Sequence, residues 1–131
     1  MRAVADFNVD SFDPVPSPEG EDAARHGRVR IEKTFHGDIE GHGSVEMLAV
    51  RGDAGSGYVA IEHISGSVNG LSGGFSLLHI GTMAGTEQWG HWPLIPGSGT
   101  GDLRTIRGEG RIENDAAGNH GFTLDYELDM T

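Results

Sequence analysis

The sequence predicts an all-β protein whose short strands and tight turns close into a barrel. Glycine accounts for 22 of the 131 residues, well over twice its usual share of about 7%. The glycines fall at intervals between short segments in which apolar and polar residues alternate, which is typical of strands joined by turns. No segment keeps a helical apolar period over a sufficient length, so the core must come from strands packed on strands.

Eight strands are predicted, and the last shows the clearest alternation of apolar and polar residues. They cover residues 3–12, 28–39, 44–50, 57–68, 73–83, 87–95, 108–113 and 121–130. Eight strands without a helical cover would leave two unprotected edges if they formed an open sheet. An eight-stranded antiparallel barrel is therefore favoured.

The chain has the length of one ordinary domain, which we assign to residues 1–131. Within it, residues 13–27 are rich in proline and charge, and proline excludes regular ladder pairing. This segment is expected to be a connecting loop, with a lid over a barrel mouth as the alternative.

The charge balance limits the partners and the compartment. With 20 acidic and 9 basic residues, the net charge of −11 argues against nucleic acid and against anionic membranes. There is no cysteine, no apolar run as long as a membrane span, and no apolar signal-peptide core near the first residue. We expect a soluble, cytoplasmic protein.

The glycine-rich stretch from Trp92 to Gly110 looks like a phosphate-binding loop but lacks its key features. A nucleotide-binding loop needs a lysine followed by serine or threonine, with a helix behind it. This stretch has neither the lysine nor the helix. We interpret it as a structural corner in which Pro96 ends a strand, glycines allow a tight reversal, and residues 101–108 form a short helical turn.

Four ionisable residues fall on one level when the hairpins are aligned by their expected turns. The alignment places Lys33 opposite Glu46, Glu46 beside Glu62, and Glu62 opposite His79. If this polar belt faces inward, it brings a cation, two carboxylates and an imidazole together, a set that can move protons. The alternative is a solvated ladder on the outer face, because a register slip of one residue reverses every side chain.

Other catalytic and metal motifs are not found. His36 and His42 flank a turn, but their spacing matches no established ligand pattern, and no metal site or redox cofactor is expected. Ser98 has no strand-to-helix context, so it is not expected to be a nucleophile.

Three runs of residues carry a resemblance to a known family. They are VRIEKTFHGDIEGHGSVEML, GYVAIEHISGSVNGLSGGFSLLHIGTM and WPLIPGSGTGDLRTIRGEG, within residues 28–113. They resemble the bacterial family called domain of unknown function 3224, whose fold is similar to the allene oxide cyclase barrel. The resemblance implies an eight-stranded oligomeric barrel with an interior cavity and no agreed activity. The chain departs from the family pattern at Phe12, at Met47 and in the segment before Trp92.

Three functions are compatible with the sequence. The first is a cofactor-independent isomerase or cyclase. In it Glu62 is the acid or base, His79 is its partner, and Glu46 and Lys33 set the pKa of Glu62. In this hypothesis the pocket for a partly apolar metabolite is lined by Tyr58, Phe35, Phe75, Trp89 and Trp92. The second is a module that binds or carries a small molecule without changing it, and the third is hydrolysis of a peptide by paired carboxylates.

Overall fold

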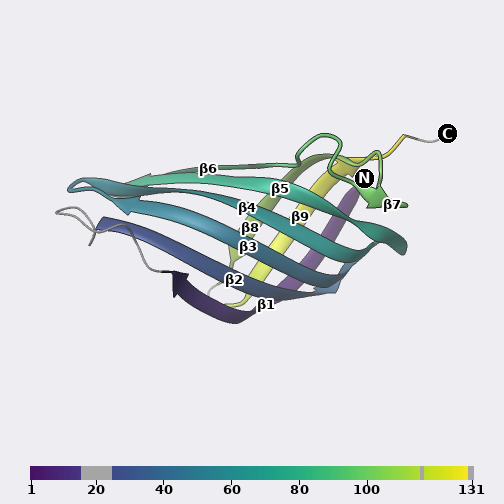
Figure 1. The fold of residues 1–131 in the computed structure, drawn as a ribbon, viewed down its shortest axis with the longest axis horizontal. Helices are drawn as coiled ribbons and strands as arrows, with labels where there is room; N and C mark the ends of the chain where they lie inside the picture. Colours follow the sequence, from purple (N-terminus) through teal and green to yellow (C-terminus); the bar gives the residue numbers. More distant parts are fainter. Residues whose placement is uncertain (16–24, 116, 130–131) are drawn as a thin grey trace.

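The computed structural model describes residues 1–15, 25–115 and 117–129, which form an all-β barrel (Figure 1). The strands in this part of the chain are β1 (Arg2–Val15), β2 (His26–Gly37), β3 (Ile39–Arg51), β4 (Gly55–Val68), β5 (Leu71–Ala84), β6 (Glu87–Pro93), β7 (Thr100–Gly101), β8 (Arg107–Asn114) and β9 (His120–Glu127). Eight long strands pair in the order β4-β3-β2-β1-β9-β8-β6-β5, and β5 pairs again with β4, so the ring closes. All pairings are antiparallel, which confirms the predicted eight-stranded antiparallel barrel.

The strands match the predicted segments but are longer at several ends. β3 begins at Ile39 rather than residue 44, and β1 continues to Val15, into the segment that we expected to be a loop. Pro14 pairs with Val29 there, so proline does not end the strand. The physical reason is that β9 pairs with β1 only as far as Phe7, and a strand paired on one side tolerates proline. Residues 16–24, the rest of the expected loop or lid, lie outside the described residues.

The turn between β4 and β5 closes one end of the barrel with a two-residue loop. Asn69 and Gly70 both have positive φ, 48° and 85°, as the Asn-Gly hairpin turn requires. The Asn69 side chain donates to the hydroxyl of Tyr126 at 2.7 Å. This hydrogen bond connects the β4–β5 hairpin to β9, a strand that is not a neighbour of β4 or β5 in the sheet.

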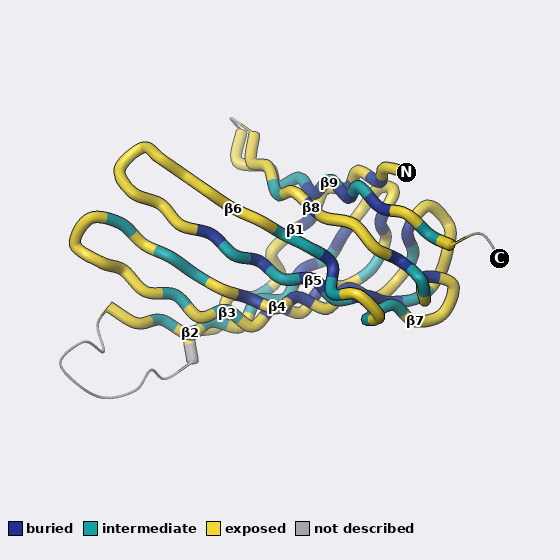
Figure 2. Tube along the Cα trace, turned by 90° about the horizontal axis from the view of Figure 1, so that it is seen from above, coloured by how far each residue is buried: buried dark blue, intermediate teal, exposed yellow. Residues whose placement is uncertain are grey.

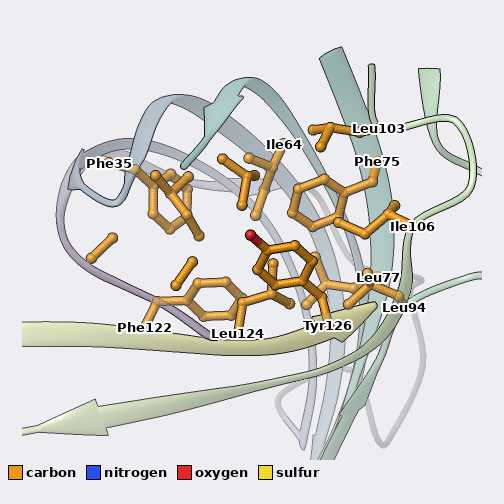
Figure 3. Close-up of a cluster of buried hydrophobic side chains, with 14 of the residues drawn as sticks. Phe35, Ile64, Phe75, Leu77, Leu94, Leu103, Ile106, Phe122, Leu124 and Tyr126 are labelled. Atoms are coloured by element: carbon orange, nitrogen blue, oxygen red, sulfur yellow. The ribbon is translucent and has the colours of Figure 1, made fainter. Parts of the chain in front are cut away.

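The hydrophobic core fills the half of the molecule in which β1, β8 and β9 complete the ring. Large side chains from β1, β2, β3, β4, β5 and β9 and from the segment between β7 and β8 meet there. Figure 3 shows many of them, among them Phe35, Phe75, Leu77, Leu103, Ile106, Phe122 and Leu124. Leu103 and Ile106 are 1% and 2% exposed. The corner therefore acts as an apolar plug at this end of the barrel.

The corner is held by side-chain hydroxyls, as a structural role requires. Ser98 Oγ accepts from the backbone N–H of Ser76 at 3.0 Å, and Thr100 Oγ1 accepts from the N–H of Gly74 at 3.0 Å. The predicted helical turn is a series of tight turns instead, in which the N–H of Leu103 bonds the carbonyl of Thr100. The serine and threonine of the supposed phosphate loop thus bind β5.

The other half of the barrel is open. β6 pairs with β8 only through Trp92 and Pro93, and its first residues, 87–91, pair with β5 alone. The hairpins at this end project past β8 and β9 (Figure 1), and exposed residues predominate along them (Figure 2). We call this part, formed by residues 10–15, 26–31, 47–60 and 79–91, the open half.

Candidate functional site

Three of the four residues of the predicted polar belt are buried together on the inner face of the barrel. Glu62 in β4 is 1% exposed, His79 in β5 is 4% exposed and Lys33 in β2 is 6% exposed. They are the buried charged or polar residues among those described. Lys33 Nζ donates to Glu62 Oε1 at 3.2 Å, and His79 Nε2 lies 2.7 Å from the same oxygen. We call these three residues the buried trio.

The second oxygen of Glu62 has no hydrogen-bond partner. Oε2 is buried and unpartnered, whereas Oε1 receives both contacts. An unpartnered buried carboxylate oxygen is costly and uncommon, so Oε2 is the atom of Glu62 with unused hydrogen-bonding capacity.

Glycine at position 43 makes room for this carboxylate. Gly43 lies opposite Lys33 in the β2–β3 ladder, and a Cβ there would collide with Glu62 Oε2 and with the ring of Phe35. The cation of Lys33 also lies 4.5 Å from the centre of the Phe7 ring, a favourable cation–π distance. The trio therefore has one wall of backbone and one wall of aromatic rings.

Glu46 does not belong to this cluster, contrary to the sequence prediction. Val45, not Glu46, lies opposite Glu62, so the side chain of Glu46 points outward, where it is 75% exposed and accepts a hydrogen bond from Arg30 at 3.2 Å. The cause is the turn between β3 and β4, which sets a register one residue away from the one that we assumed.

The register of the neighbouring hairpins also differs from the alignment, yet it leaves the other members on the inner face. Lys33 pairs with Gly43 rather than Glu46, and Glu62 pairs with Leu77 rather than His79. The first difference is a shift of three residues, which also puts Glu46 on the face opposite to Lys33. The second is a shift of two residues, so Glu62 and His79 stay on the same face, where a diagonal contact joins them.

A second unpartnered polar atom lies on the same inner face. Ile80 pairs with His91 and Leu77 bridges to Leu94, so the register places Trp92 across from His79. Trp92 Nε1 is buried without a partner, and the indole packs against the core. The N–H of Trp92 is a donor without a partner, and Glu62 Oε2 is an acceptor without a partner. The two residues thus lie in neighbouring cross-strand rows of the inner wall.

The other predicted pocket residues separate into three environments. Phe35 and Phe75 are fully buried in the core, behind the trio. Tyr58 is half-buried on the inner face of the open half, where its ring covers Gly81. Trp89 pairs with Thr82 and is 57% exposed on the outer face, so the structure does not bring it to the trio.

The inner wall becomes more exposed from the trio toward the open half. Two residues from His79, at Gly81, the wall is still buried, but at Met83 it is 45% exposed. Beyond Glu62, Tyr58 is half-buried, and Phe12 in β1 is 56% exposed. The trio therefore lies where the closed core meets the open half.

A surface cluster has the residue types of a nucleophilic triad but not its geometry. Ser44 Oγ and His42 Nε2 both contact Glu32 Oε2, at 2.7 and 2.6 Å. The serine donates to the carboxylate at 2.7 Å, and its contact with His42 Nε2 is much longer, at 3.5 Å, so the short serine–imidazole hydrogen bond of a triad is not formed. The hydrogen bond from Ser44, aided by His42, lowers the pKa of Glu32.

The remaining histidines form no metal centre within the described residues. No group of three or more histidine or carboxylate side chains is arranged there to hold an ion. His36 lies 3.9 Å from Glu40, and His63 Nδ1 lies 3.0 Å from the hydroxyl of Ser76. In the described part of the chain, no helix is long and apolar enough to cross a membrane.

The fold and the buried trio define the class of protein: an eight-stranded antiparallel barrel with an ionisable cluster on its inner wall. The family model described as protein of unknown function (DUF3224) matches residues 3–126, so the chain belongs to the DUF3224 family. It is similar to the crystal structure of a DUF3224 protein of unknown function from Shewanella oneidensis MR-1. The TM-score is 0.85 at 28% identity, over 99% of this chain and 98% of that one. No functionally curated protein matches the chain.

Proposed function

We propose that this chain is a cofactor-independent acid–base enzyme of the isomerase or cyclase type, acting on a small, partly apolar molecule on the inner wall. The observation that carries the proposal is the asymmetry of Glu62. One of its oxygens is fixed by Lys33 and His79, and the other is buried and free. A carboxylate held in this way keeps its position while its free oxygen accepts a proton.

The reaction that fits this geometry is the transfer of a proton between two carbons of one molecule. Glu62 Oε2 would remove a proton from a carbon next to a carbonyl group, and the electron pair of the broken C–H bond would form an enolate. The N–H of Trp92 is the donor that could stabilise the enolate oxygen. In a substrate whose enolate is conjugated with a C=C bond, Glu62 would then return the proton to the far carbon of that bond. The double bond moves, so that the product is an isomer and no co-reactant is consumed.

Lys33 and His79 would act through Glu62 in this proposal. Lys33 offsets the negative charge that burial would otherwise disfavour, and His79 fixes the orientation of the carboxylate. Tyr58 and the exposed apolar residues of the open half, such as Met83, would line the path of entry.

A binding or carrier module is the second candidate, because the same free atoms would hold a ligand without chemistry. Glu62 Oε2 and Trp92 Nε1 supply one acceptor and one donor, which suffices to orient a molecule that has both. Hydrolysis by paired carboxylates is not proposed, since Glu46 and Glu62 lie on opposite faces of the sheet.

The test combines ligand detection with proton exchange. The protein, purified under native conditions, is analysed by native mass spectrometry, and a panel of small carbonyl compounds with exchangeable C–H groups is then incubated with it in D2O. Deuterium incorporation is followed by NMR. We expect incorporation with the wild type, a loss of at least about 100-fold in Glu62→Gln, and no loss in the matched control Glu46→Gln.

The outcomes separate the two candidates. Binding without exchange would assign the chain to the carrier class. If no compound of the panel binds or exchanges, both candidate functions are excluded, and the trio is a structural element.

A further inference from the structure

An apolar surface lies on the outer face of the barrel, where it is separated from the trio by the sheet itself, and His79 is among the residues that line it. A groove of about 740 Å³ crosses β2 to β5 there. Its walls are two cross-strand rows of outward-facing side chains, with Leu48, Val59 and Ile80 in one row and Ile61 and Leu78 in the other. The residues between the rows, such as Ala60, point inward, so they contribute their backbone to the floor.

The walls of the groove are unusually apolar for the water-facing side of a sheet. Leu48, Val59 and Ile61 are 52%, 51% and 54% exposed. An antiparallel barrel with one wet face normally carries polar residues at such positions. Val50 and Trp89, 47% and 57% exposed, extend the apolar surface beyond the groove. A small ligand in the groove would leave these two side chains in water, whereas a second protein surface would cover them.

The total surface area also favours a protein partner. The chain exposes 8044 Å², whereas a compact monomer of 13.9 kDa exposes roughly 6,700 Å². The excess, roughly 1,300 Å², is larger than the roughly 800 Å² per partner that a stable protein interface buries. A self-association of ordinary size would remove about 800 Å² per copy, and the exposed inner wall of the open half accounts for a further part of the excess.

The charges around the groove permit an identical copy to approach. The chain carries −11 overall, so most contacts between two copies are repulsive. Among the residues that line the groove, Glu46 is the single acid, and it is paired with Arg30, while Arg28 adds a further positive charge. This face therefore carries charges of both signs and lacks the acidic excess of the chain as a whole, so two copies meeting here avoid the repulsion between acidic surfaces.

We propose that this face is the interface of a symmetric homodimer, in which the grooved outer surfaces of β3, β4 and β5 from two copies pack together. The face is self-complementary in charge, as an isologous contact requires, because each copy offers both Arg28 and Glu46. The trio lies on the opposite side of the sheet, so the dimer leaves the inner wall open.

The experiment is sedimentation equilibrium of the full chain over a range of concentrations. Wild-type protein is expected to be dimeric, and Ile61→Glu and Val59→Lys are expected to be monomeric with unchanged circular dichroism. Val4→Lys is the matched control, since Val4 is 51% exposed on the outer side of β1, and it should stay dimeric. A monomeric wild type, or a dimer that survives both groove variants, would overturn the proposal.

A second measurement keeps the test decisive if a groove variant does not fold. The chain has no cysteine, so Ile61→Cys introduces a single thiol. A short bis-maleimide is expected to join two copies of Ile61→Cys and to leave Val4→Cys as monomers. Equal cross-linking in both variants, or none in Ile61→Cys, would contradict the proposed interface.

Discussion

Gly43 and Glu62 share one space: the carboxylate of Glu62 occupies the volume that a side chain at position 43 would fill. Any Cβ at this position collides with Glu62 Oε2 and with Phe35. The position of the free oxygen therefore depends on a residue without a side chain, in a strand next to that of the carboxylate.

Gly43→Ala is expected to destabilise the fold and displace Glu62. Overpacking of a buried site costs about 1–3 kcal/mol, since neither Phe35 nor the hydrogen-bonded carboxylate can move freely. Urea denaturation measures the loss. Gly27→Ala in β2 is the control, because nothing lies within 4 Å of a Cβ there. Equal urea midpoints of unfolding for Gly43→Ala and Gly27→Ala would show that a methyl group fits at position 43.

The buried ion pair predicts a strong coupling between Lys33 and Glu62. Glu62→Ala leaves the cation of Lys33 buried without its partner, which costs about 3–5 kcal/mol, whereas Glu46→Ala breaks an exposed pair and costs less than about 1 kcal/mol. A double variant, Lys33→Met with Glu62→Leu, should lose less stability than the sum of its single variants, by about 0.5–3 kcal/mol. Additive losses in this cycle would refute the coupling.

Trp92→Phe removes an unpaired buried N–H and keeps most of the ring. Stability is expected to change by less than about 1.5 kcal/mol, because the lost volume is offset by removal of the unsatisfied donor. Ligand binding or proton exchange, if present, should weaken. Thermal unfolding together with the D2O assay measures both, and a stable variant with full activity would exclude Trp92 from the site.

The ion pair between Arg2 and Asp125 makes the stability of the fold decrease at acidic pH. The hydrogen bond from Arg2 at 2.9 Å lowers the pKa of Asp125 below its ordinary value. Its contribution to stability is therefore present above the unfolded pKa of about 3.9 and is lost as the pH falls through the lower folded value. Arg2→Gln should move the pKa of Asp125 upward in an NMR titration. An unchanged titration midpoint would show that Arg2 is not the cause.

The barrel could be predicted from the sequence because its signals are local. Alternation and regularly spaced glycine define strands and turns, and these are short-range properties. Pro14 shows the limit: whether proline is tolerated depends on whether a neighbouring strand pairs on that side, which the local sequence does not reveal.

The candidate site could be predicted only in part, because register depends on turn geometry. The inward direction of Lys33 and His79 could be predicted, since each follows apolar residues of the same face, and the hairpin alignment predicted Glu62 beside them. Glu46 was misplaced because the turns on both sides of β3 set other registers, shifted by three residues against β2 and by one residue against β4. The outer groove was missed, although the apolar runs around Leu48 and Ile61, in which both faces of a strand are apolar, could have indicated a covered outer surface.

The pairing of β1 with β9 sets when the barrel can form. Arg2 bonds Asp125 across 123 residues of sequence, and the backbone N–H of Tyr126 bonds the carbonyl of Met1. On the ribosome, at about 5–20 residues per second, the first strand therefore waits for several seconds until its partner is made. During that time the nascent sheet has an uncovered edge at β1, and its apolar inner wall faces water. The ring therefore closes only after β9 has been synthesised, and until then the free edge of β1 can pair with another strand.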